Sequence, residues 1–134
     1  MKRFFYICFL IPVLCFLVSC MDTKNTGIKL VTAEEMISIL ESEDVQVIDV
    51  RTPEEYGEVH ISNAQNIDYF SPTFEEDITK LDKEKPVILY CKGGTRSAKC
   101  AKKMEEAGFE KIYDLEGGLS RWQHSEELEL EVKS

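Results

Sequence analysis

In the second half of the chain, a short apolar run leads directly into a cysteine and a pair of glycines. Residues 87–90 (Val-Ile-Leu-Tyr) have the composition of a buried strand, and Cys-Lys-Gly-Gly follows at 91–94. Beyond Ser97 the apolar residues recur at helical spacing as far as Ala107. The sequence therefore predicts a strand, a tight loop and a helix, with Cys91 at the corner between them.

Cys91 is a candidate nucleophile because the predicted features around it favour the thiolate, which is the reactive form of cysteine. Gly93 and Gly94 allow the backbone to turn its N–H groups toward one point. The helix that follows adds the positive end of its dipole, and Lys92 and Arg96 add cationic charge nearby. On these residues alone, a buried cysteine before a glycine turn stays an alternative.

Strand-like and helix-like segments alternate along the rest of the domain. Two pairs, Thr32 with Glu35 and Thr52 with Glu55, have the spacing of capping boxes at helix starts. This alternation predicts an α/β fold, in which a mostly parallel central sheet has helices on both faces and the site lies at the carboxyl ends of the strands. Besides 87–90, strands are predicted at 28–31 (an edge strand), 45–50, 64–67 and 112–115, and a weak helix or extended turn at 74–81.

Three stretches resemble the rhodanese-like sulfurtransferases, in the order in which that family has them. Residues 91–97 match the active-site loop Cys-x-x-Gly-x-Arg-Ser/Thr. Residues 49–64 are similar to the signature Asp-x-Arg-x-x-x-Glu-aromatic-x-x-Gly-His-Ile-x-Gly/Asn-Ala, although Val59 replaces the usual glycine, so the turn before His60 need not follow the family. Residues 117–122 resemble the closing Gly-Gly-x-x-x-Trp, whose Trp122 is expected to pack near the loop. The resemblance covers nearly the whole domain.

The resemblance implies sulfur transfer without a cofactor. Cys91 would attack the outer sulfur of a small anionic donor such as thiosulfate or a persulfide, and the resulting persulfide would lie within the backbone N–H groups of Lys92 to Ser97, a stretch that includes Gly93, Gly94 and Thr95. Cyanide or a thiol, including a thiol of a partner protein, would then accept the sulfur. Lys92 would bind the donor at the rim of the loop. Arg96 is expected to hold the loop through a carboxylate.

Other polar residues of the signature are assigned supporting roles. Asp49 and Arg51 are expected to make buried hydrogen bonds that hold the loops beside the site, and His60 to pack and hydrogen-bond rather than catalyse. Cys100 shares a helix stripe with apolar residues, which predicts a buried structural cysteine. His60 and His124 are isolated from any cluster at ligand spacing, so no metal site is expected.

The sequence leaves three other functions open. A phosphatase or arsenate reductase of the same fold is disfavoured, because relatives of that type use Cys-x5-Arg, whereas Cys91 and Arg96 form the shorter Cys-x4-Arg. A non-enzymatic sulfur carrier or binding module would form the persulfide and deliver it to a partner protein. A thiol–disulfide role would pair Cys91 with Cys100.

The first residues are typical of a bacterial lipoprotein signal rather than of the domain. Lys2 and Arg3 precede an apolar run from Phe4 to Val18, which is short for a membrane span, and residues 17–20 (Leu-Val-Ser-Cys) resemble a lipobox. The predicted layout is a signal peptide at 1–19, a tether at 20–27 with lipidated Cys20, a rhodanese-like domain at 28–124, and an acidic tail at 125–134 that frays or adds a loose element.

Charge limits the expected partners. The formal net charge is −9, and cleavage before Cys20 would make it −11 by removing Lys2 and Arg3. An acidic surface argues against binding nucleic acid or anionic headgroups. Contact with the membrane is therefore expected through the lipid anchor alone, which places the protein in the cell envelope, facing the periplasm.

Overall fold

The computed structural model describes residues 27–134. The predicted signal peptide, the lipidation site Cys20 and residues 20–26 of the tether lie outside this range. Within it, no helix is both long and apolar enough to cross a membrane.

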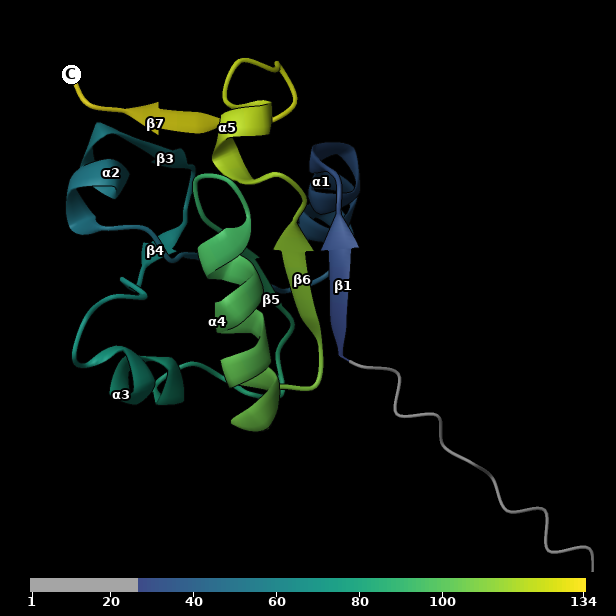
Figure 1. Ribbon diagram of the computed structural model, residues 1–134. Helices are drawn as coiled ribbons and strands as arrows, with labels where there is room; N and C mark the ends of the chain where they lie inside the picture. The colour runs from purple at the N-terminus through teal and green to yellow at the C-terminus, as the bar shows by residue number, and fades with distance from the viewer. Residues whose placement is uncertain (1–26) are drawn as a thin grey trace, which may run out of the picture.

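A five-stranded parallel sheet forms the centre of the domain (Figure 1). Its order is β1 (Ile28–Val31), β6 (Ile112–Leu115), β5 (Val87–Tyr90), β2 (Gln46–Asp49) and β4 (Gln65–Asn66). Each neighbouring pair runs parallel, so the predicted parallel sheet is confirmed, with β1 at an edge. All four residues of β5 are buried, as expected for a central strand covered on both faces.

Helices cover both faces of this sheet, as predicted. In Figure 1, α3 (Phe74–Thr79) and α4 (Thr95–Glu106) lie in front of the sheet and α1 (Ala33–Ser42) lies behind it. The core divides in the same way, because α3 and α4 share one buried cluster, whereas α1 and α5 (Gly118–Trp122) share the other. Leu89 and Cys91 belong to the α4 side and Ile88 and Tyr90 to the α1 side, as the alternation of a strand requires.

Helix starts follow the local signals closely. Thr32 begins α1 and Thr52 begins α2 (Pro53–Glu58), each with the predicted reciprocal capping box. Helix α4 begins at Thr95, two residues before the predicted start. Its N-cap is Gly94, which has a left-handed backbone (φ 98°) and offers no side chain to cap the helix, so the usual sequence signal is missing.

Part of the predicted acidic tail belongs to the folded domain. Strand β7 (Leu130–Val132) pairs antiparallel with β3 (Val59–Ile61), and Leu128 is buried. The expectation of a frayed or loose end is therefore wrong for these residues, because alternating glutamates hid a strand with one apolar side. Val59, the departure from the family signature, is extended (φ −158°) and starts β3, a conformation that does not require glycine.

Candidate active site

Cys91 leaves the carboxyl end of β5 and turns into the loop that leads to α4. Its side chain is 1% exposed and belongs to the core cluster on the α4 side of the sheet. The Cys91 carbonyl accepts a hydrogen bond from the N–H of Leu119 in α5 at 2.8 Å. Cys91 is therefore buried, and its backbone is fixed by a hydrogen bond to α5.

Two groups of the segment that follows Cys91 contact its sulfur atom. The Gly94 N–H donates to Sγ at 3.1 Å, and the Ser97 Oγ lies 3.5 Å from Sγ. The Ser97 hydroxyl also donates to the Gly94 carbonyl at 3.2 Å. Of the ring of amides predicted from Lys92 to Ser97, the structure brings Gly94 to hydrogen-bond distance of the sulfur. The N-terminal end of the twelve-residue helix α4 points at the same place.

Arg96 holds the loop through the carboxylate pair that the sequence predicts, and Glu55 is its partner. The guanidinium is bidentate, with Nη1 at 2.7 Å from Oε2 and Nη2 at 2.9 Å from Oε1. Glu55 also accepts the Thr52 N–H at 3.0 Å, as part of the capping box of α2. Hydrogen bonds from Arg96, against the effect of partial burial, lower the pKa of Glu55 to about 2. This ion pair joins the loop to α2.

Asp49 and Arg51 form a buried ion pair, so the buried hydrogen bonds predicted for them are present. Arg51 Nη2 lies 2.7 Å from Asp49 Oδ2 and also donates to the Val59 carbonyl at 2.6 Å. The guanidinium stands 5.7 Å from the centre of the Tyr90 ring. Tyr90 in turn accepts the Ile61 N–H, and burial raises the pKa of its hydroxyl strongly. The pair thus links β2, β3 and β5 just below the loop.

His60 packs and hydrogen-bonds, as predicted. Its ring stacks on Tyr56 with 3.8 Å between centroids, and Nδ1 lies 2.9 Å from the Tyr56 carbonyl. Nε2 lies 3.1 Å from Glu131, which fastens β7 to β3. Both ring nitrogens are engaged in structure. Within residues 27–134, no three His, Cys, Asp or Glu side chains are placed to hold a metal ion.

The Gly-Gly pair at the start of α5, where Gly117 is the N-cap and Gly118 the first residue, is a part of the site whose role the sequence does not reveal. Gly118 has φ 62°, and a Cβ added there would stand 2.6 Å from the Cys91 carbonyl oxygen. This close approach lets two loop carbonyls, those of Cys91 and Lys92, accept N–H groups of Leu119 and Ser120 at 2.8 and 2.9 Å. The glycine pair is visible in the sequence, but the segment of backbone that it contacts is determined by the tertiary fold.

Trp122 closes this segment. Its indole donates to the Glu116 carbonyl at 2.8 Å, and its ring packs, half-buried, on the core cluster of the α1 side. It therefore anchors α5, the helix whose N–H groups donate to the carbonyls of the loop.

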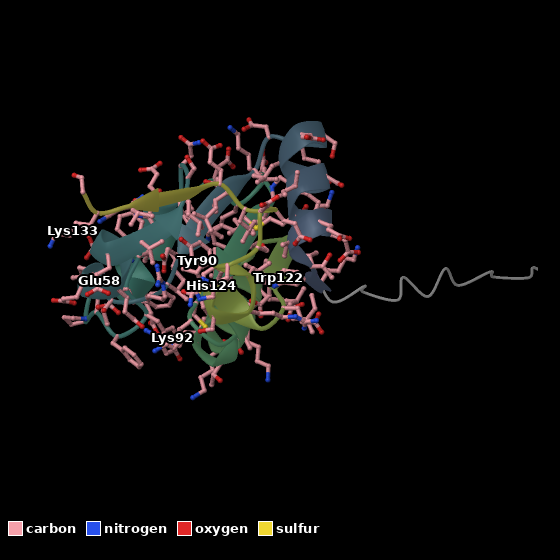
Figure 2. All side chains as sticks on the ribbon, turned by 90° about the horizontal axis from the view of Figure 1, so that it is seen from above. Glu58, Tyr90, Lys92, Trp122, His124 and Lys133 are labelled. Carbon is pink, nitrogen blue, oxygen red and sulfur yellow. The ribbon has the colours of Figure 1, made fainter. Side chains whose placement is uncertain are left out.

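A cleft of about 240 Å³ opens beside the loop. Lys92 is exposed at its edge, and in the view from above it lies farther from the centre of the molecule than Tyr90, the last residue of β5 (Figure 2). A larger hollow of about 460 Å³ lies between α1 and residues 127–129 and includes no residue of the loop. The smaller cleft is lined by Arg51, Glu55, Glu58, Val59, Lys92, Leu119, Ser120 and Gln123.

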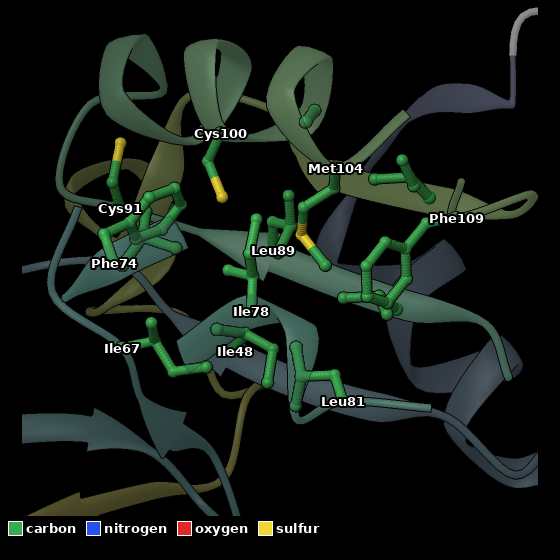
Figure 3. Packing of buried hydrophobic residues seen from close by; sticks show 14 residues of the cluster. Ile48, Ile67, Phe74, Ile78, Leu81, Leu89, Cys91, Cys100, Met104 and Phe109 are labelled. Carbon is green, nitrogen blue, oxygen red and sulfur yellow. The ribbon is translucent and has the colours of Figure 1, made fainter. Parts of the chain in front are cut away.

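Cys100 lies on the inner side of α4 and is fully buried. Figure 3 shows the sulfur atoms of Cys91 and Cys100 pointing in different directions, with Cys100 directed at the sheet. Both thiols are free, and burial raises the pKa of Cys100 to about 12. The predicted structural role of Cys100 agrees with this placement.

Comparisons with known proteins match this domain. The model of the rhodanese-like domain family matches residues 32–125. Thiosulfate sulfurtransferase GlpE of Coxiella burnetii is 36% identical over 88 residues, which cover 66% of this chain and 80% of that protein. A solved rhodanese-like domain protein from Staphylococcus aureus shares 34% identity at a TM-score of 0.67, covering 79% of this chain and 99% of that one.

Other relatives show that the same domain occurs in larger proteins. The tRNA uridine(34) hydroxylase of Onion yellows phytoplasma is 35% identical over 101 residues, which cover 72% of this chain but 32% of that protein. The fold and the loop define an α/β domain with a cysteine-centred loop at the carboxyl edge of a parallel sheet. With the family match over most of its length, the chain belongs to the rhodanese-like domain family.

Proposed function

We propose that this protein is a sulfurtransferase of the thiosulfate sulfurtransferase type, which carries sulfane sulfur on Cys91. The observation that carries the proposal is the geometry at the sulfur, where the Gly94 N–H lies 3.1 Å from Sγ at the N-terminal end of α4. An N–H donor and a helix N-terminus both stabilise an anionic sulfur. The similarity to a relative named thiosulfate sulfurtransferase supports the same reaction.

The proposed reaction is a double displacement. The Cys91 thiolate attacks the outer sulfur of thiosulfate, a new S–S bond forms, and the old S–S bond breaks as sulfite leaves with its electron pair. Cyanide or a thiolate then attacks the outer sulfur of the persulfide, giving thiocyanate or an acceptor persulfide and restoring the Cys91 thiolate. Each step needs a nucleophile and an anionic leaving group, so neither a cofactor nor a separate general base takes part.

Neighbouring residues take distinct parts in this scheme. Lys92, exposed beside the cleft, draws the anionic donor toward the loop. Arg96 is a positioning residue, because both of its terminal nitrogens are used by Glu55. A thiol of a partner protein is the second kind of acceptor in this scheme, beside cyanide.

Two observations weigh against the alternative reactions. The loop from Cys91 to Arg96 has six residues, one fewer than the Cys-x5-Arg loop that holds a tetrahedral oxyanion. A thiol–disulfide reaction would need Cys100, which is fully buried and faces the sheet. A sulfur carrier shares the first half of the scheme and differs only in lacking turnover with a small acceptor.

We also propose that Cys20 is lipidated and that it anchors the domain to a membrane of the cell envelope, facing the periplasm. The support is the signal-like segment at 1–19 and the lipobox resemblance at 17–20. Replacing Cys20 with Ser should move the protein from the membrane fraction to the supernatant. Membrane attachment that survives this substitution would contradict the lipid anchor.

The sulfur reaction is tested by intact mass after treatment with thiosulfate. We expect a gain of one sulfur atom, which Cys91→Ser abolishes and the matched control Cys100→Ser retains. Turnover of thiosulfate and cyanide to thiocyanate then separates an enzyme from a carrier, which loads but does not turn over. A sulfur gain in Cys91→Ser would refute the assignment, and a loss of two hydrogens instead of a sulfur gain would indicate a disulfide.

A further inference from the structure

A buried carboxylic acid lies under the loop and takes no part in the proposed reaction. Asp114 in β6 is 2% exposed, and its Oδ1 has no hydrogen-bond partner within residues 27–134. Its register partner in β5 is Leu89, which is also buried. A buried carboxyl oxygen without a hydrogen-bond partner is costly, so the presence of Asp114 at this position needs a physical explanation.

Strand alternation places Asp114 on the same side of the sheet as Cys91. Ile112 belongs to the core cluster on the α4 side and Leu115 to the other, so Asp114, two residues after Ile112, faces α4. Leu89 and Cys91 face the same way from the neighbouring strand. On the helix above, the buried residues Ser97 and Cys100 face the sheet.

The pKa shifts of Asp114 and Cys100 agree with the position of Asp114 beneath α4. Burial raises the pKa of Asp114 to about 6, while the Ser97 hydroxyl acts in the opposite direction. Asp114 in turn contributes to the raised pKa of Cys100. The titratable groups on this side of the sheet near Asp114 are Cys100 on α4, whose pKa it affects, and Cys91 at the end of β5; its register partners on both adjoining strands, Leu89 and Leu30, do not titrate.

We propose that Asp114 is a positioning residue that sets the direction of the Ser97 hydroxyl and thereby makes the reactivity of Cys91 depend on pH. Ser97 donates its one hydroxyl hydrogen to the Gly94 carbonyl at 3.2 Å, its oxygen lies 3.5 Å from the Cys91 sulfur, and it is near enough to the Asp114 carboxyl group to lower the pKa of that group. An ionised Asp114 accepts this hydrogen and adds negative charge beneath the sulfur. A protonated Asp114 donates to Ser97 Oγ, which leaves the hydroxyl hydrogen for the anionic sulfur.

The sign of the effect follows from these two states. Above a pH of about 6, the ionised Asp114 opposes the Cys91 thiolate, and below it the opposition is removed. Asp114→Asn is neutral at every pH, so it should react faster than the wild type above this pH and at the same rate below it. The inference rests on the proposed function for its biological meaning, because the same hydroxyl would face the persulfide.

The test is the rate of Cys91 alkylation by iodoacetamide between pH 5 and 8, measured by intact mass in the Cys100→Ser background. We expect the ratio of the Asp114→Asn rate to the Asp114 rate to be near one at pH 5 and to rise about three- to tenfold with a midpoint near pH 6. Adding Ser97→Ala to both proteins should reduce this rise, because it removes the effect carried by the hydroxyl and leaves only the direct effect of the Asp114 charge on the sulfur. Circular dichroism shows that each variant is folded, and Asp114→Ser replaces Asp114→Asn if the amide does not fold.

Two results would overturn the inference. A ratio that is constant across this pH range would show that Asp114 does not act on Cys91. A rise that persists unchanged with Ser97→Ala would remove the role assigned to the hydroxyl. Alkylation does not depend on sulfur transfer, so a failure to gain sulfur from thiosulfate would contradict the proposed function while leaving this result intact.

Discussion

Gly118 should be a residue on which both the stability of the domain and the shape of the loop depend. A Cβ at this position would stand 2.6 Å from the Cys91 carbonyl oxygen and 2.6 Å from the carbonyl carbon of Lys92. Both neighbours are backbone, so Gly118→Ala cannot be accommodated by rotating a side chain. The substitution must push α5 away from the loop.

The magnitude follows from two effects. A residue with a side chain held at φ 62° costs about 1–2 kcal/mol. Moving α5 weakens the hydrogen bonds from Leu119 and Ser120 to the loop carbonyls, and two such bonds contribute about 1–3 kcal/mol together. We therefore expect the free energy of unfolding to fall by about 2–5 kcal/mol, and the alkylation rate of Cys91 to change because its carbonyl is released.

Urea unfolding followed by circular dichroism measures this loss. Gly57→Ala is the matched control, because a Cβ at Gly57 meets no atom within 4 Å and alanine favours the helix α2 that contains it. Gly117→Ala is intermediate, since its Cβ would meet the flexible side chain of Arg121 rather than backbone. Equal stability of Gly118→Ala and Gly57→Ala would refute the close approach of α5 to the loop.

Three further predictions concern the surroundings of the loop. Hydrogen bonds from Arg96 depress the pKa of Glu55 to about 2, so the ion pair stabilises the fold above about pH 4.5 and this contribution is lost as the pH falls toward 2. Glu55→Gln should lower the free energy of unfolding at neutral pH by about 1–2 kcal/mol and make it depend less on pH below 4.5. Lys92→Gln should raise the KM for thiosulfate about three- to tenfold with kcat nearly unchanged, and an unaltered KM would exclude Lys92 from donor binding. Ending the chain at Glu127 removes buried Leu128 and strand β7, and urea unfolding should register a loss of about 2–4 kcal/mol; unchanged stability would show that β7 contributes nothing.

The parts of the fold that the sequence predicts well are those with local causes. The run before Cys91 marks a central strand because apolar residues at every position suit burial on both faces. The capping boxes at Thr32 and Thr52 depend on residues three positions apart, so they can be identified without any tertiary contact. The corner with Cys91 combines these local signals, and its position at the carboxyl end of β5 follows from the parallel sheet.

The parts that the sequence does not reveal depend on distant residues. A carboxylate partner for Arg96 was expected, but Glu55 is 41 positions away and already had a local role in the capping box. The strand β7 could not be recognised because its pairing with β3 and the burial of Leu128 become visible only when both segments are placed. Asp114 resembles an ordinary strand residue in the sequence, since nothing near it indicates that it would be buried with its Oδ1 unpaired within residues 27–134.

These long-range contacts also fix the position of the loop around Cys91. The loop is fastened to α2 through Arg96 and Glu55, and to α5 through the carbonyls of Cys91 and Lys92. The carbonyls of Cys91 and Lys92 are bound by α5, while the Gly94 amide of the same loop donates to the sulfur. An anion stabilised by fixed dipoles needs no reorganisation when charge develops, which is how such a site lowers a barrier. Loosening either fastening should therefore slow the chemistry at Cys91 even when the sulfur itself is untouched.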